Sequence, residues 1–309
     1  MSKNVLITGG TGMIGQRLTQ MLQDKGYEVA HLSRSRPDRS RSGHSGPVKT
    51  YVWDIQKKEI EPEALQQADY VIHLAGAGVA DKRWTESRKK IILKSRTEST
   101  RLLHDTLANL GENRLKAFIS ASAIGIYGSD TGSAEIHETS PKGDDFLADV
   151  TRQWEAVVDE IKRLNIRTAK LRIGVVLSMK GGALPRIVQP VKLGVGAPLG
   201  SGQQYVSWIH IDDLCRMIVY ALEHEQMDDV YNAVAPGPVT NKELTQTAAH
   251  ILHKPLFLPN VPGFAIKLAF GEMASIVLGG NRVSSRKVQE NGFEFNFKNI
   301  QSALNDLLN

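Results

Sequence analysis

Length, composition and charge exclude several classes of protein. The chain has 309 residues, 41% of them hydrophobic, and a formal net charge of +5 at pH 7. No signal-peptide pattern opens it and no apolar run is long enough to span a membrane, so we expect a cytoplasmic protein without a membrane partner. The one cysteine, Cys215, cannot form an intrachain disulfide, and the nine histidines are scattered. We therefore expect a reducing compartment and no metal site.

An apolar, β-branched run at residues 3–8 predicts the first strand, which ends in a glycine-rich turn from Thr8 to Gly15. Apolar residues then recur at helical spacing up to Lys25, and residues 28–33 predict a second strand. A glycine turn between a strand and a helix is typical of dinucleotide binding, because the bare backbone approaches the pyrophosphate and the helix N-terminus attracts its charge. The turn residues expected at the cofactor are Gly9, Thr11, Gly12, Met13, Ile14 and Gly15.

The end of the second strand predicts which dinucleotide is bound. Proteins that prefer NAD usually carry an acid there, which holds the ribose 2′-hydroxyl, whereas a 2′-phosphate needs cations or hydroxyls. This chain has Ser33, Arg34 and Ser35 instead. We therefore predict NADP(H), with Arg34 at the 2′-phosphate and the serines donating hydrogen bonds. Asp54, after the third strand, could touch the adenine or could be an ordinary turn residue.

The residues that follow this strand form a basic stretch rich in Ser, Arg, Gly and Pro. Its cations are Arg34, Arg36, Arg39 and Arg41. Surfaces that bind single-stranded nucleic acid interleave aromatic side chains with cations, and this stretch has none. The pattern favours a solvated loop or a small-anion site, so we expect no nucleic-acid partner.

Further strands are expected at residues 49–53, 70–74, 117–122 and 168–177, separated by loops and helical segments. This alternation predicts an α/β fold with a Rossmann-type, doubly wound parallel sheet in the order 3-2-1-4-5-6. A long amphipathic helix should begin at an N-cap, Thr85. It could pair subunits in a homodimer or only cover the sheet.

The local composition of the chain changes near residue 180, after which glycine and proline residues interrupt the helical and strand patterns. We predict a Rossmann domain at 1–180, to which residues 205–235 return, and a smaller, interleaved C-terminal substrate domain formed by 181–204 and 236–309. The return is indicated by a strand-like run at 208–211, followed by Asp212 and Asp213 as candidate caps of the next helix.

Several motifs resemble the short-chain dehydrogenase/reductase superfamily. His73-Leu74-Ala75-Gly76 is similar to its cofactor-lining turn. Residues 120–128, Ser-Ala-Ser-Ala followed by Ile-Tyr-Gly, resemble the Ser-Ser-Ser-Ala-x-x-Tyr-Gly motif of the extended, sugar-nucleotide epimerase branch. Residues 171–174 and 208–213 are similar to further signatures of that branch. The resemblance implies cofactor contacts at Leu74, Ala75, Gly76, Ser120, Ala121, Arg172 and Gly174, and it makes Ser122 the active-site serine that bonds a substrate carbonyl or alcohol.

The superfamily's acid/base pair, Tyr-x-x-x-Lys, is absent, because none of the seven tyrosines has a lysine four residues on. In that pair the ammonium group lowers the pKa of the phenol one helical turn away. The altered segment at 144–155, the run at 181–184 and the tail at 264–293 resemble an atypical subgroup. This is the epimerase family of nucleoside-diphosphate-sugar epimerase-like proteins with a C-terminal domain of unknown function, and the resemblance covers essentially the whole chain.

Other residues could replace the missing pair. Tyr127 is the tyrosine closest in sequence to Ser122 and is the candidate proton carrier, or it packs at a strand end. Asp144 and Asp145 lie just before the altered helix, where they could reach the nicotinamide end of the cofactor or could cap the helix. The candidates for the substrate side are Trp84, Lys142, Arg186, Trp208 and His210.

These observations predict an NADP(H)-dependent oxidoreductase or epimerase-like enzyme. Its partner would be a small-molecule substrate, a nucleotide sugar or another carbonyl compound, bound between the two parts of the chain. The absent Tyr and Lys favour an alternative from another class: a non-catalytic NADP(H) sensor or regulatory binding protein, whose conformation a partner reads.

Overall fold

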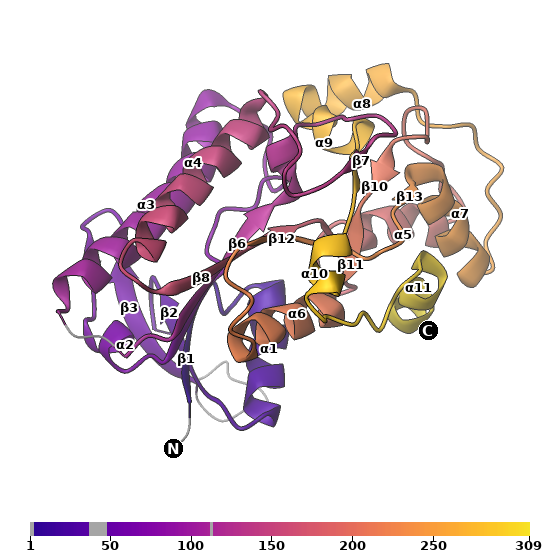
Figure 1. Cartoon of the computed structure of the whole chain (residues 1–309). Helices are drawn as coiled ribbons and strands as arrows, with labels where there is room; N and C mark the ends of the chain where they lie inside the picture. Colours follow the sequence, from indigo (N-terminus) through magenta and orange to yellow (C-terminus); the bar gives the residue numbers. More distant parts are fainter. Residues whose placement is uncertain (1–2, 37–47, 112–113) are drawn as a thin grey trace.

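The computed structural model describes residues 3–36, 48–111 and 114–309. One large β-sheet lies at the centre of the fold (Figure 1). Its strand order is β12-β8-β6-β5-β1-β2-β3-β4, and every pair is parallel except β3–β4. The strands are β1 (Asn4–Thr8), β2 (Glu28–Ser33), β3 (Lys49–Asp54), β4 (Glu59–Ile60), β5 (Tyr70–His73), β6 (Ala117–Ala123), β8 (Arg167–Ile173) and β12 (Val230–Ala233). The predicted doubly wound fold and its order are confirmed, with β12 added beyond the sixth strand.

Helices cover both faces of this sheet (Figure 1). On one face α1 (Met13–Asp24) packs with α6 (Ile211–Glu223), and on the other α3 (Glu86–Asn109) packs with α4 (Phe146–Lys162). Because successive side chains of a strand point to opposite faces, Ile7 joins the core under α1 and α6 while Leu6 joins the core under α3 and α4. Cys215 of α6 is a fully buried core residue, as its apolar surroundings in the sequence indicate.

The expected strand at 168–177 is broken into two. β8 ends at Ile173, and β9 (Val175–Leu177) leaves the large sheet to pair in parallel with β11 (Trp208–His210). Gly174 makes the break possible, because a Cβ atom at this position would lie 2.3 Å from the carbonyl oxygen of Ser207. The chain therefore changes sheets at a close backbone approach that periodicity does not reveal.

The sequence predicts the N-cap residues of two helices, α3 and α6. Thr85 is the N-cap of α3, as expected, and its hydroxyl accepts the Arg88 amide at 3.2 Å. The N-cap of α6 is His210 rather than an aspartate: its Nδ1 atom accepts the amide of Asp212 at 3.1 Å. Asp212 lies in the first turn instead, where it forms an ion pair with Arg17 of α1 at 2.6 Å.

The C-terminal part packs around a third core that includes Trp208, Leu244 and Leu304. Its elements are α5 (Leu184–Lys192), β10 (Tyr205–Val206), β13 (Val239–Thr240), α7 (Asn241–Ile251), α8 (Gly263–Phe270), α9 (Ser275–Leu278), β14 (Arg282–Val283), α10 (Arg286–Glu290) and α11 (Ile300–Leu308). β14 pairs with β7 (Glu135–Ile136), a short strand from the first half of the chain. The domain boundaries stay a prediction.

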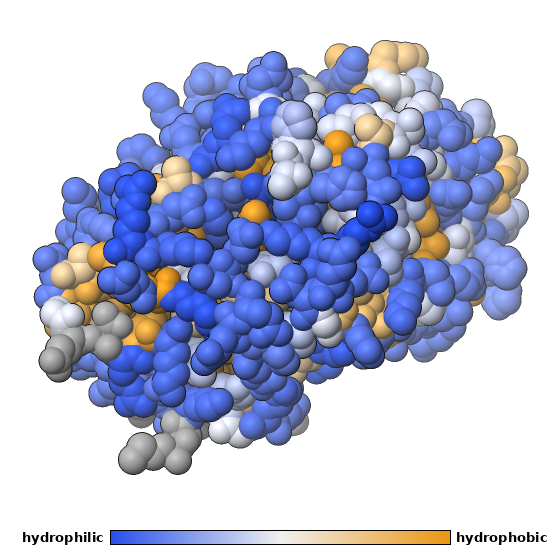
Figure 2. Space-filling view, in the orientation of Figure 1, coloured by the Kyte–Doolittle hydropathy of each residue, from blue (hydrophilic) through white to orange (hydrophobic). Residues whose placement is uncertain are grey.

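The surface seen in Figure 2 is mostly hydrophilic, with small apolar groups at several places, one of them at the top, where α8 lies. Phe264 and Leu268 of this helix are among the exposed apolar side chains. Within the described ranges, no helix combines the length and hydropathy that a membrane crossing requires.

Candidate functional site

The glycine turn after β1 folds tightly against the end of β5. Gly9 has a φ of +72°, and its carbonyl oxygen accepts the Gly12 amide at 3.0 Å. A Cβ atom at Gly15 would lie 2.4 Å from that same oxygen, and one at Gly9 would lie 3.0 Å from the Leu74 backbone. Glycine is thus required for the turn itself and for the close approach of α1.

Helix α1 begins directly after this turn with its first amides free. Gly12 provides no side-chain cap, and the first turn contains no acidic residue. Among the described residues, the amides of Met13, Ile14 and Gly15 have no acceptor. Three free N–H groups at the positive end of a 12-residue helix form an anion site, so the turn fits the pyrophosphate of a dinucleotide.

The end of β2 combines an unpaired cation with two hydroxyls. Arg34 and Ser35 are exposed and Ser33 is half-buried. Arg36 forms an ion pair with Glu61 at 2.8 Å, whereas Arg34 has no ion-pair partner among the described residues. Arg39 and Arg41 lie outside the described residues. No acid ends the strand, so the geometry leaves Arg34 available for a phosphate.

Asp54 at the end of β3 has a structural role in the turn that follows. Its Oδ1 atom accepts the amides of Gln56 at 2.9 Å and Lys57 at 3.1 Å. This is the turn interpretation that the sequence left open, and the adenine contact stays a prediction.

A buried hydrogen-bond chain shapes the loop after β5. The Thr8 hydroxyl accepts the amides of Leu74 and Ala75, both at 3.1 Å, so it donates its own proton to Nδ1 of His73 at 2.7 Å. His73 then donates from Nε2 to Thr100 at 3.0 Å. Burial lowers the pKa of His73 to about 3 and keeps the ring neutral. The two loop amides are therefore committed internally, and any cofactor contact there must come from other atoms.

Arg96 of α3 supports the same loop and was missed by the sequence reasoning. Its Nη1 atom donates to the carbonyl oxygens of Ala77 at 3.0 Å and Ile92 at 2.9 Å, and its guanidinium lies over the Trp154 ring. A Cβ atom at Gly76 would lie 3.2 Å from Cζ of Arg96. Burial and the charge of Arg88 lower the pKa of Arg96 to about 10. One signal was available: Arg96 is four residues from both Ile92 and Thr100, so it lies on the same face of the predicted helix as these uncharged residues.

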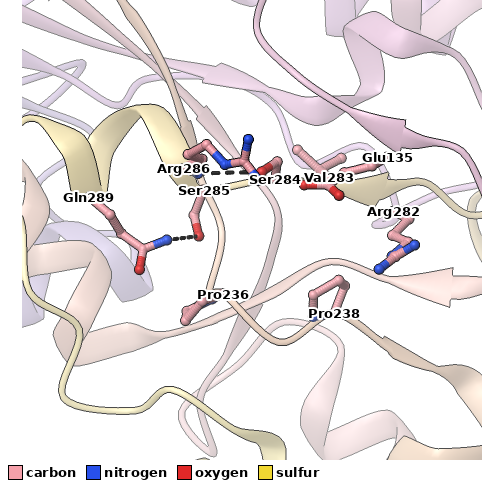
Figure 3. A pocket seen from close by; sticks show the side chains of 9 residues that line it. All are labelled: Glu135, Pro236, Pro238, Arg282, Val283, Ser284, Ser285, Arg286 and Gln289. Carbon is pink, nitrogen blue, oxygen red and sulfur yellow. Dashed lines mark hydrogen bonds between the residues drawn. The ribbon is translucent and has the colours of Figure 1, made fainter.

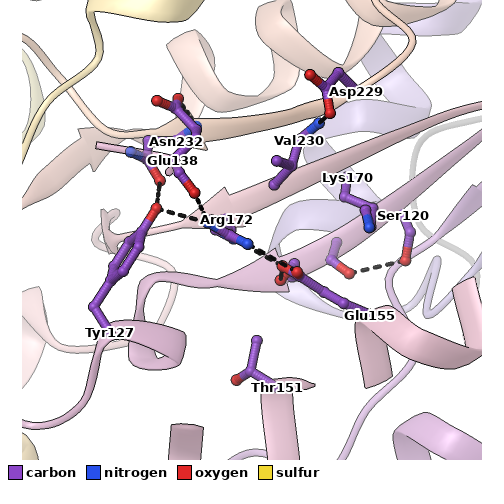
Figure 4. Close-up of polar contacts among 12 residues, drawn as sticks. Ser120, Tyr127, Glu138, Thr151, Glu155, Lys170, Arg172, Asp229, Val230 and Asn232 are labelled. Carbon is purple, nitrogen blue, oxygen red and sulfur yellow. Dashed lines mark hydrogen bonds and ion pairs between the residues drawn. The ribbon is translucent and has the colours of Figure 1, made fainter. Parts of the chain in front are cut away.

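Ser122, near the end of β6, is hydrogen-bonded to a carboxylate that the sequence reasoning did not select. Its Oγ atom donates to Oε1 of Glu155 in α4 at 2.6 Å. Arg172 of β8 binds both oxygens of this carboxylate, each at 2.9 Å (Figure 4). Burial acts to raise the pKa of Glu155, but Arg172 and Ser122 outweigh it and lower the pKa. Glu155 is therefore ionised at neutral pH, and its carboxylate accepts the hydrogen bond that the Ser122 hydroxyl donates.

Tyr127 does not fit the expected role of proton carrier. The side chain is buried, its hydroxyl donates to Asn232 at 2.7 Å, and it accepts from Arg172 at 2.9 Å (Figure 4). Burial raises the pKa of Tyr127 to about 12, against the smaller opposing effect of Arg172. A proton carrier needs a lowered pKa and access to substrate, so the packing interpretation describes this residue better.

Three residues expected at the cofactor have partners within the protein. The Arg172 guanidinium is taken up by Glu155, Tyr127 and the Glu138 carbonyl oxygen. Gly174 is required by the approach of Ser207, and the fully buried Ser120 donates its hydroxyl to a neighbouring carbonyl oxygen. The Arg172 and Ser120 side chains are thus bonded within the protein and Gly174 has only its backbone to offer, and the cofactor contacts of the three residues stay a prediction.

Two residues expected on the substrate side lie in the protein core. Trp208 is fully buried, and its indole N–H donates to the Gly237 carbonyl oxygen at 2.8 Å. His210 is 1% exposed, caps α6 and stacks on Phe297 at 3.8 Å between ring centroids. Burial lowers the pKa of His210. Neither side chain is placed to reach a substrate, because each completes a packing contact.

The other three candidates lie at or near the surface. Trp84 donates to the Val79 carbonyl oxygen at 2.8 Å, and Arg186 reaches the Ala80 carbonyl oxygen at 3.3 Å. The structure thus brings these two side chains together on the loop after β5. Lys142 is exposed and has no ion-pair partner among the described residues.

The parallel sheet, its order and the glycine turn before an uncapped helix define the class: a Rossmann-type α/β protein built like those that bind dinucleotides at the first strand–helix turn. The model of the NAD dependent epimerase/dehydratase family matches residues 5–234, and a domain of unknown function, DUF1731, matches residues 261–307. The chain belongs to the NAD dependent epimerase/dehydratase family. The resemblance drawn from the motifs, including its C-terminal domain, is confirmed.

Curated relatives match over nearly the full length of the chain. The chloroplastic homologue of epimerase family protein SDR39U1 from Arabidopsis thaliana is 38% identical over 98% of this chain and 86% of the relative. Epimerase family protein YfhF from Bacillus subtilis is 35% identical over 99% of this chain and 98% of the relative.

Solved structures agree with this assignment. Human epimerase family protein SDR39U1 (isoform 2), crystallised with NADPH, is 34% identical, covers 98% of both chains and superposes with a TM-score of 0.86. UDP-glucose 4-epimerase from Thermotoga maritima, crystallised with UDP-glucose, is 19% identical with a TM-score of 0.77 over 98% of this chain and 97% of that chain. At that identity it shows a shared fold alone.

Proposed function

We propose that this chain binds NADP(H) at the glycine turn and acts as an oxidoreductase or epimerase-like enzyme on a small hydroxyl or carbonyl compound. The observations that carry the cofactor are the free N-terminus of α1 and, at the end of β2, Arg34 with no ion-pair partner among the described residues and no acid in the strand's last position. The NADPH in the human relative's structure supports the same choice.

Different groups of residues would contact the different parts of the cofactor. The amides of Met13, Ile14 and Gly15 would hold the pyrophosphate, and Arg34 with its flanking serines would hold the 2′-phosphate. The loop after β5, fixed by Thr8, would line the nicotinamide half. When bound, the nicotinamide supplies or accepts a hydride.

The direction of the Ser122 hydrogen bond limits what the substrate can be. The Ser122 proton already points to Glu155, so its Oγ atom offers lone pairs and can only accept. A substrate hydroxyl fits this acceptor. When that hydroxyl becomes a carbonyl, its proton would pass to Ser122 Oγ as the serine proton passes to Glu155. This pair would do what the missing Tyr and Lys do elsewhere, on a nucleotide sugar or another secondary alcohol.

Substitution of Ser122 tests the proposal. We expect Ser122→Ala to bind NADPH as the wild type does and to lower turnover of any alcohol or ketone found by screening about a hundredfold or more, a typical value for proton-transfer residues. Ser120→Ala is the matched control, because Ser120 lies two residues away on the same strand and its hydroxyl donates to the Ala121 carbonyl oxygen. Equal rates in Ser122→Ala and Ser120→Ala would refute the role.

The second candidate, a cofactor sensor, is an outcome of the same screen. It requires tight NADPH binding without turnover of any alcohol or ketone, together with a partner whose binding depends on the cofactor. That result would retain the cofactor site and remove the catalytic assignment.

A further inference from the structure

A cavity of about 290 Å³ lies between β7, β14, the start of α10 and the loop after β12 (Figure 3). Two arginines line it, Arg282 from β14 and Arg286 from α10. Neither forms an ion pair among the described residues. Two exposed guanidinium groups four residues apart, both at one hollow and neither paired, provide donors for an anion.

The remaining polar groups of the cavity leave a net positive charge. A hydrogen bond from Ser284, together with the charges of His137, Arg282 and Arg286, lowers the pKa of Glu135 against the opposing effect of burial, so Glu135 is ionised. Two arginines against one carboxylate leave a charge of +1 on these lining side chains.

The buried hydroxyl of Ser285 provides a further hydrogen-bond donor in the wall of this cavity. Ser285 is 2% exposed and accepts from Gln289 at 3.0 Å (Figure 3). Its own proton has no acceptor among the described residues. Pro236 and Pro238 form an apolar stretch of the lining. Guanidinium and hydroxyl donors are the groups that bind phosphoryl oxygens, and the proline rings suit a small carbon body.

This cavity is separate from the glycine turn. Its prolines belong to the loop after β12, and β8, β6 and β5 lie between β12 and β1 in the sheet. Asn232 joins its wall to the Ser122 network: the side-chain Nδ2 of Asn232 donates to the Ser284 carbonyl oxygen at 3.1 Å, and its Oδ1 accepts from Tyr127. The cavity and Ser122 thus lie at opposite ends of one buried hydrogen-bond chain.

We propose that this cavity is a binding site for a phosphoryl oxyanion, distinct from the dinucleotide site. The anion lies between Arg282 and Arg286 and accepts from Ser285. Glu135 repels it and so keeps its affinity moderate. The ligand is either free phosphate or a small phosphomonoester whose body lies on the prolines.

Isothermal titration with inorganic phosphate and with phenyl phosphate tests the proposal on the full chain. The titrations use protein saturated with NADPH, so that phosphate bound at the glycine turn or at the end of β2 is not counted. One saturable site is expected. Tighter binding of phenyl phosphate identifies an ester as the ligand, and equal or tighter binding of inorganic phosphate identifies the free ion. Either result supports the site.

Variants assign the binding to these residues. Arg282→Gln and Arg286→Gln should each weaken binding about tenfold, as loss of a charge-assisted hydrogen bond does. Glu135→Gln should strengthen it several-fold by removing a like charge, a gain that misfolding cannot produce. Arg163→Gln is the control, because Arg163 is an exposed arginine at the C-cap of α4 and is paired with Glu160. Absence of saturable binding, or unchanged affinity in both arginine variants and in Glu135→Gln, would overturn the proposal.

Discussion

Two buried side chains have charge states that their neighbours fix. Glu155 is ionised because Arg172 binds both of its oxygens, and it determines the direction of the Ser122 hydrogen bond. His73 is neutral because it is fully buried between Thr8 and Thr100, and it determines the shape of the loop after β5. Both effects act within hydrogen-bond distance, so each can be tested by one substitution.

His73 should make stability depend on pH. Its folded-state pKa, about 3, is below the ordinary value of 6.5, so the unfolded chain binds a proton that the folded chain does not. The stability from neutral His73 is therefore complete above pH 6.5 and is lost as pH falls from 6.5 toward 3. In the one-proton limit the free energy of unfolding drops by about 2 kcal/mol between pH 7 and pH 5.

Urea unfolding at pH 7 and pH 5 measures this drop in the wild type and in His73→Gln. We expect the drop to be smaller in the variant by about that amount. Burial also lowers the pKa values of His31 and His210, which account for part of the remaining slope. An identical drop in both proteins would show that His73 is not the group responsible.

The sequence identifies Ser122 as a candidate site residue but does not identify the residues of its hydrogen-bond network. A motif within one strand identifies the serine, whereas Glu155 is 33 residues away in the chain and Arg172 a further 17. No spacing rule joins residues on β6, α4 and β8, because only the parallel pairing of the strands brings them together. Tyr127 was selected for its nearness in sequence, and burial gives it a different role.

At the scale of elements, α4 carries Glu155 and begins at a side-chain cap. Asp145 is the N-cap, and its carboxylate accepts the Ala148 amide at 2.9 Å. Of the two aspartates that the sequence offered, only Asp145 does this. Asp144 is exposed and lies just before the cap.

This pair allows a matched test of the cap. Asp145→Ala should lower the free energy of unfolding by about 1 kcal/mol, the usual cost of losing an N-cap, while Asp144→Ala should change it little. Glu155 lies ten residues into the helix, so both variants should keep NADPH affinity. Equal denaturation midpoints for the two variants would contradict the assignment of the cap.

Most elements follow from sequence because their causes are local. Apolar periodicity predicts α1, α3 and the strands of the first half, and Thr85 signals the start of α3. The sequence predictions fail where an element depends on residues far away in the chain or on an unusual capping side chain. The break at Gly174 depends on Ser207, and the cap of α6 is a histidine whose imidazole acts where an aspartate is more usual.

At the scale of the whole molecule, the sheet order was predictable and the packing of the C-terminal part was not. The βαβ units fix the order of the parallel strands by simple handedness and connection rules. The pairing of β14 with β7, by contrast, joins two-residue strands from opposite halves of the chain. Strands this short have no period to detect, and the cavity beside them could not be expected from sequence.

The central claim is that this fold selects NADP(H) through Arg34, and fluorescence titration with NADPH and NADH tests it most directly. We expect the wild type to bind NADPH at least about tenfold more tightly, and Arg34→Ala to lose that preference while binding NADH unchanged. Arg36→Ala, which removes a cation already paired with Glu61, should keep the preference. Equal affinities in the wild type, or an undiminished preference in Arg34→Ala, would contradict the account.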